Sequence, residues 1–103
     1  AVSGSGPAYV FHLIEAMAAA GQAEGLSPAV AMQLARATVC GAGELAHRAP
    51  ESAAQLRINV TSPGGTTAAA LGVLEGAGIR GTFARAVHAA TLRSRQLAEG
   101  TGK

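Results

Sequence analysis

The 103-residue sequence contains no Trp and a single Cys, and aromatic side chains make up only 3% of it. One Cys excludes an internal disulfide and a cysteine-based metal site. No apolar stretch reaches the roughly 18 residues of a membrane span, and there is no signal-peptide pattern. The sequence therefore predicts neither a disulfide-stabilised scaffold nor a membrane protein, and it is compatible with a cytoplasmic location.

The charged residues also lack a pattern. Eight basic and six acidic side chains give a formal net charge of +2, and no Asp is present. The basic groups form no run, and the one Tyr and two Phe are not interleaved with them. Nucleic-acid binding favours a basic stripe or stacking aromatics. The sequence predicts no nucleic-acid partner.

What the chain does contain is a large apolar fraction, 49%, to which alanine contributes most. Small side chains let helices approach closely, but each one buries little apolar area. A monomer built this way has a thin core, so the composition favours an obligate oligomer. The sequence starts at Ala1 without an initiator Met, which favours an excised domain or a fragment.

Apolar residues recur at helical spacing on both sides of one central break, and no strand pattern is convincing. The predicted fold is all-α: a helical bundle of about five helices, two of them long and antiparallel. The expected ranges are 7–24, 28–46, a short helix starting at 51–56, then 67–75 and 79–97.

The sequence also predicts how particular residues of the two long helices pack. In the second long helix, Val30 and Leu34 begin a predicted apolar spine. Gly41 and Gly43 lower helix propensity, so they are expected to mark a close backbone crossing. Cys40 is expected to be a buried packing residue. In the first helix, His12 and Glu15 lie one turn apart; a surface or interface hydrogen bond is favoured over an acid–base catalytic pair.

The central break has a distinct chemistry. Pro63 removes a backbone donor, while Gly64 and Gly65 allow positive φ and close approach to the backbone. Thr66 or Thr67 is expected to cap the following helix. Unpaired N–H groups before a helix suit an anion such as a carboxylate or phosphate. A plain helix–helix connection is the alternative that spacing alone favours.

The residues around this break resemble those of a known family. Leu56-Arg57, Asn59 to Thr67 and then Leu71, Leu74 and Glu75 are similar to the signature of pyrroline-5-carboxylate reductases. Ser3 to Phe11 resembles the opening of that family's C-terminal domain, and Ala86-Val87 and Arg93-Ser94 its closing helix. The resemblance covers nearly the whole chain in the family's order.

The resemblance implies an activity and a domain plan. These enzymes reduce 1-pyrroline-5-carboxylate to L-proline with NADPH or NADH. An N-terminal Rossmann domain binds the cofactor, and a helical C-terminal domain forms an interlaced homodimer, sometimes a higher homo-oligomer, with the substrate pocket. No Gly-x-Gly-x-x-Gly follows a strand in this chain. Residues 1–103 are thus expected to be the helical domain alone, inactive in isolation.

The resemblance also implies roles for the central residues. Thr67 matches the threonine whose hydroxyl reaches the ring nitrogen, as the catalytic residue. By the same resemblance, the backbone N–H groups of Gly64, Gly65, Thr66 and Thr67 are expected to hold the substrate carboxylate. Ser62 is expected to shape the pocket, and Pro63 completes the expected substrate-binding set. Asn59 and Val60 match positions facing the cofactor, and no metal is expected. The alternatives are a non-catalytic helical oligomerisation module and, last, an anion-binding regulator.

Overall fold

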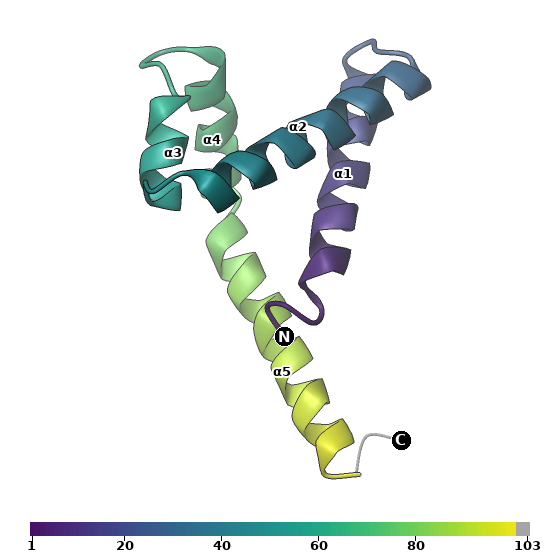
Figure 1. Ribbon diagram of the computed structural model, residues 1–103. Coiled ribbons are helices and arrows are strands. Elements are labelled where there is room, and N and C mark those ends of the chain that lie inside the picture. Colours follow the sequence, from purple (N-terminus) through teal and green to yellow (C-terminus); the bar gives the residue numbers. More distant parts are fainter. Residues whose placement is uncertain (101–103) are drawn as a thin grey trace. The chain divides into compact units, whose positions relative to one another are not determined.

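The computed structural model describes residues 1–100, which form five helices and no strand (Figure 1). In chain order they are α1 (Gly6–Ala23), α2 (Pro28–Arg48), α3 (Ala53–Asn59), α4 (Thr66–Gly76) and α5 (Ile79–Ala98). The predicted all-α class and number of helices are confirmed. The chain divides into two compact units, Ser5–Pro50 and the remainder, and each is described by itself.

The first unit is the hairpin of α1 and α2. Ser27 caps α2, because its side chain accepts a hydrogen bond from the Val30 amide at 3.3 Å, and Pro28 follows in the first turn. Gly25 ends the preceding helix with φ +105°, a left-handed conformation that glycine adopts without strain. The two predicted boundaries are confirmed. Figure 1 shows α1 and α2 packed near this turn and diverging toward their other ends.

The contact between α1 and α2 is made of alanines. Ala18, Ala31 and Ala35 are its buried residues, at 3–4% exposure, and Ile14, Met17 and Met32 pack partly buried around them. At Gly21 a Cβ atom would lie 3.4 Å from the Ala31 Cβ and 3.3 Å from a Leu26 methyl. Close packing therefore depends on small side chains on both helices, as the composition predicts.

Three packing expectations for α2 are wrong within this chain. Val30 and Leu34 are 42% and 51% exposed, because the neighbouring alanine face, one residue further on, packs against α1. Gly41 and Gly43 face open space, so the close approach occurs at Gly21 instead. Cys40 is exposed, since it lies off the alanine face. Periodicity located a helix correctly but selected the face with the larger side chains.

In the second unit, α3 begins later than expected. Ser52 is its N-cap, accepting from the Gln55 amide at 3.1 Å, so Glu51 precedes the helix and is not in its first turn. The helix continues through Leu56 to Asn59. The short apolar run before the break is thus the last turns of α3.

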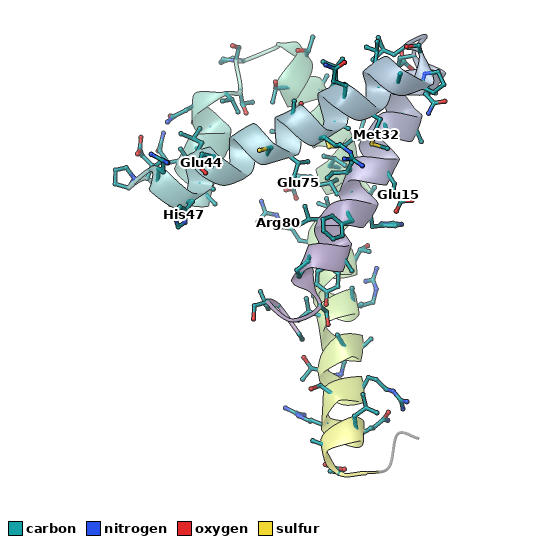
Figure 2. All side chains as sticks on the ribbon, turned by 45° about the vertical axis from the view of Figure 1, so that its right-hand side comes forward. Glu15, Met32, Glu44, His47, Glu75 and Arg80 are labelled. Carbon is teal, nitrogen blue, oxygen red and sulfur yellow. The ribbon has the colours of Figure 1, made fainter. Side chains whose placement is uncertain are left out.

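The junction of α4 and α5 turns at Gly78, which has φ +79°. Arg80 Nε donates to the two Glu75 carboxylate oxygens at 2.9 and 3.1 Å, so an ion pair spans the turn (Figure 2). None of the described residues of α3, α4 or α5 is buried. Large exposed apolar side chains in these helices are Ile58, Val73, Leu74, Phe83, Leu92 and Leu97. This unit lacks a core of its own.

Candidate functional site

The segment between α3 and α4 contains a tight turn from Ser62 to Gly65. The Gly65 amide donates to the Ser62 carbonyl at 3.0 Å, with Pro63 and Gly64 between them. Gly64 has φ +71°. Proline in the second position and a positive-φ glycine in the third are the pattern of a type II turn. The sequence folds this way locally because Pro63 fixes its own φ and Gly64 tolerates the left-handed region.

Gly65 is required for a different reason. A Cβ atom at this residue would lie 3.2 Å from the Ser62 carbonyl oxygen and 3.3 Å from the Ser62 Cβ. Gly65 itself has extended backbone and occupies the N-cap position of α4. The turn therefore folds back tightly on the start of the helix, and a side chain here would push the two apart.

The expectation that Thr66 or Thr67 caps α4 is wrong. Gly65 is the N-cap, both threonines are within the first turn, and no side chain caps the helix. Because the cap residue has no side chain, the first amides of α4 lack the partner that a Ser or Asp would supply. The first backbone hydrogen bond of the helix is donated by Ala69 to the Gly65 carbonyl at 3.2 Å.

The turn and the helix start thus present unpaired donors. Among residues 1–100 no acceptor is hydrogen-bonded to the amides of Gly64, Thr66 and Thr67, whereas the Gly65 amide is engaged by Ser62. No acidic residue lies in the first turn of α4. The helix dipole adds partial positive charge at the same end. Chemically, this arrangement suits a small anion, and Gly65 contributes its shape rather than its N–H.

Two hydroxyl groups near the turn differ in their hydrogen bonding. Thr61 Oγ1 donates to the Arg57 carbonyl at 2.5 Å and so helps to end α3. Thr67 is half-buried, and its hydroxyl has no hydrogen-bond partner in the described part of the chain. The hydroxyls of Ser62 and Thr66 are also available to a ligand, but these two residues are exposed, and Thr67 alone of the three is half-buried.

At the end of α3, Asn59 and Val60 lie directly before the turn. Val60 is 63% exposed. The Asn59 carboxamide is exposed, and its Oδ1 accepts from Gln55 Nε2 at 2.7 Å. This pair was not predicted from the sequence, although the four-residue spacing of Gln55 and Asn59 places both side chains on one helix face.

A separate cavity of about 300 Å³ lies in the α1–α2 unit. It is lined by Phe11, Ile14, Glu15, Met32 and Arg36, so an apolar interior carries one carboxylate and one guanidinium. Figure 2 labels Glu15 on α1 and Met32 on α2. Periodicity did not reveal this cavity, because it depends on how the two helices diverge. No hydrogen bond joins His12 to Glu15.

Residues 1–100 contain neither a metal-binding cluster nor a membrane-spanning helix. No group of three or more His, Cys, Asp or Glu side chains in that range is placed to hold a metal ion. None of the helices described there is both long and apolar enough to cross a membrane. The segment from Asn59 to Thr67, which contains the unpaired amides of Gly64, Thr66 and Thr67, is the candidate site.

Fold and site together define an all-α domain in which a helical hairpin accompanies a glycine-rich helix–turn–helix segment. Residues 1–97 match the family model described as pyrroline-5-carboxylate reductase dimerisation. The chain belongs to this family, as its resemblance at the central segment predicted.

Curated relatives agree. Pyrroline-5-carboxylate reductases of Synechocystis and Pisum sativum are 51% and 50% identical over 93% of this chain. The chain spans 36% and 35% of their lengths. The Pseudomonas aeruginosa enzyme is 45% identical over the full chain, which covers 38% of it.

Solved structures of the family have the same fold. The Coxiella burnetii pyrroline-5-carboxylate reductase superimposes with a TM-score of 0.90 at 45% identity, over 93% of this chain and 36% of that one. The NADP-bound Plasmodium falciparum pyrroline carboxylate reductase gives 0.86 at 35% identity, over 99% and 37%.

Proposed function

We propose that this chain is the dimerisation and substrate-binding part of a pyrroline-5-carboxylate reductase, which reduces 1-pyrroline-5-carboxylate to L-proline with NADPH or NADH. The observation that carries the proposal is the set of unpaired amides at Gly64, Thr66 and Thr67. A carboxylate on a small ring needs such donors. The family membership of residues 1–97 supports the same activity.

The substrate carboxylate is bound by the turn. Hydrogen bonds to a charged acceptor contribute about 1.5–3 kcal/mol each, and the start of α4 adds its dipole. The amides of Gly64, Thr66 and Thr67 act as donors, while Ser62, Pro63 and Gly65 hold the turn that presents them. Gly65, whose own amide is engaged, is in this proposal a shaping residue.

Thr67 has a second role beside its amide. Its free hydroxyl hydrogen-bonds the ring nitrogen and fixes which face of the imine is exposed. The pKa of an aliphatic hydroxyl is far too high for it to be the sole proton source, so water delivers the proton to that nitrogen. Thr67 acts by orientation, and orientation is a large component of catalysis in two-substrate reactions.

The nicotinamide cofactor, when bound, supplies the hydride. Its fit to this chain is tested by the donors at the end of α3: Gln55 occupies Asn59 Oδ1, which leaves the Asn59 NH2 group to face an acceptor oxygen. Exposed Val60 offers an apolar surface beside it. These two residues suit one end of such a cofactor. Most of its binding belongs to a Rossmann domain outside these residues.

The same proposal includes a homodimer in the cytoplasm. Three alanines are the buried core, while large apolar side chains remain exposed on every helix. Exposed apolar surface of this extent is typical of an interface. The open space at Gly41 and Gly43 on α2 also permits close approach of a second molecule. The dimerisation family supports a second copy of the chain as that molecule.

Thr67→Val in the full-length protein that carries this chain tests the function. The substitution keeps the shape and removes the hydroxyl. We expect kcat/KM for pyrroline-5-carboxylate to fall on the order of 10- to 100-fold, with the oligomeric state unchanged. Thr66→Val is the matched control, because it makes the same chemical change one residue away while keeping both amides; its activity should change less than about threefold.

The outcomes separate the reductase from the non-catalytic oligomerisation module. Turnover that is lost in Thr67→Val and kept in Thr66→Val supports the reductase. Equal activity in both variants removes the role of the Thr67 hydroxyl. No turnover by the unmodified full-length protein, with an intact oligomer, favours the non-catalytic oligomerisation module. The 103-residue chain alone is expected to dimerise without turnover, which sedimentation and a coupled NADPH assay measure.

A further inference from the structure

A polar pair of side chains lies on the exposed face of α3, at the end that leads into the candidate site. Gln55 Nε2 donates to Asn59 Oδ1 at 2.7 Å, which is short for an N–H···O hydrogen bond. Both side chains are solvent-exposed, and no buried residue in α3 forces them together. The contact therefore joins two carboxamides on a helix face where packing does not hold them.

Gln55 is itself held at its backbone. Its amide donates to the side chain of Ser52, the N-cap of α3, at 3.1 Å. One helical turn separates Gln55 from Asn59, so the two side chains lie on the same face. In this seven-residue helix, Gln55 therefore contacts the N-cap Ser52 through its backbone and the last residue, Asn59, through its side chain.

We propose that Gln55 is a positioning residue that orients Asn59 toward the nicotinamide cofactor. An asparagine side chain presents either an acceptor or two donors, depending on a half-turn of its amide. Gln55 engages the acceptor, so the Asn59 NH2 group meets an acceptor oxygen of the cofactor. The inference rests on the proposed function, because that function brings the cofactor to Asn59.

The effect of Gln55 on binding is indirect and small. A Gln–Asn pair at this spacing contributes little by itself, so Gln55→Ala should raise the Kd for NADPH about twofold in the full-length protein. Asn59→Ala removes a direct hydrogen bond and should raise it about fivefold. Alanine favours helix at both positions, so α3 is retained. NADPH fluorescence without substrate measures each Kd.

A double-mutant cycle isolates the positioning role. If Gln55 acts through Asn59, Gln55→Ala has no further effect in an Asn59→Ala background. The same twofold loss in both backgrounds would overturn the inference, because Gln55 would then contribute independently. No loss from Gln55→Ala alone would overturn it as well.

Reversing the polarity of the pair gives a sharper readout. Gln55→Glu replaces the donor by an acceptor, which attracts the Asn59 NH2 group and turns its oxygen outward. We expect weaker NADPH binding than for Gln55→Ala. Ala54→Glu is the control for the added negative charge, since Ala54 is exposed on the same helix but lies five residues from Asn59. A charge effect fades at high salt, whereas an orientation effect persists.

Failure of the inference and failure of the function are distinguishable. If Asn59→Ala binds NADPH normally while the full-length protein still reduces pyrroline-5-carboxylate, the inference is overturned and the function stands. If the unmodified protein neither binds NADPH nor turns over, the proposed function fails, and the inference fails with it. If Gln55→Glu and Ala54→Glu weaken binding equally at every salt concentration, charge alone explains Gln55→Glu and positioning is overturned.

Discussion

The two units of this chain differ in what they complete by themselves. The α1–α2 hairpin buries three alanines between its own helices, and Gly25 and Ser27 end α1 and begin α2 at the turn between them. The unit containing α3, α4 and α5 buries no residue and leaves the first amides of α4 without partners. The hairpin has a small buried core of its own, whereas the other unit has backbone donors that no acceptor in the described residues occupies. Function is therefore expected where folding leaves groups unsatisfied.

Overpacking the alanine contact should have the largest effect on stability. Ala31→Leu adds three carbon atoms to a side chain that is 3% exposed, so we expect a loss of about 1–3 kcal/mol in the free energy of unfolding. Ala29→Leu, exposed on the same helix, should change it by less than about 0.5 kcal/mol. Urea unfolding at fixed protein concentration measures both, and equal values would show that the alanine contact is dispensable.

A substitution in the turn between α3 and α4 should have the next largest effect on stability, and its control substitution should change stability in the opposite direction. Gly64→Ala places a Cβ at φ +71°, which costs about 1–2 kcal/mol. Gly72→Ala lies within α4 with nothing within 4 Å of its added Cβ, so it should stabilise by about 0.5–1 kcal/mol. Calorimetry of both variants tests this. Two shifts of the same sign would contradict the assignment of the turn.

Removing the two serine caps tests how far the loss of one hydrogen bond destabilises the surrounding helices. Ser27→Ala and Ser52→Ala each remove one N-cap hydrogen bond, at 3.3 and 3.1 Å, and each should cost about 1 kcal/mol in helix stability. Because α3 buries nothing, Ser52→Ala should speed amide exchange mainly within residues 53–59. Ser27→Ala should act across the whole hairpin. Hydrogen exchange resolved by residue distinguishes the two patterns.

The Arg80–Glu75 ion pair should have the smallest effect. Both side chains are largely exposed, so Arg80→Gln should cost at most about 0.5 kcal/mol. High salt should remove the difference between this variant and the parent chain. A larger loss of stability in thermal unfolding that persists in high salt would contradict this expectation. It would show that the ion pair is needed to hold the α4–α5 turn.

The helices themselves were predictable from sequence. Ser27-Pro28 and Gly25 carry local signals for a helix start and stop, and the structure follows them. Local signals misled where two of them competed. Thr66 and Thr67 resemble caps, yet Gly65 takes the cap position because the type II turn before it fixes where the helix can begin.

Packing was less predictable than helix position. Both Val30 and Ala31 lie on plausible faces of α2, and hydropathy favours the larger residue. Close approach between helices favours the smaller one, and this contact decides the buried face. Within the candidate site, the type II turn could be read from Pro63 and Gly64. The hydrogen bond from the Gly65 amide to the Ser62 carbonyl could not be predicted, because it depends on how the turn folds.

The alanine contact between α1 and α2 also bears on the order of folding. Gly21 and Ala31, which meet across it, are only ten positions apart in the chain. Contacts between near neighbours in sequence need little loop closure and form early. The hairpin can therefore assemble while the rest of the chain is still being made, and its fold does not wait for α3, α4 and α5.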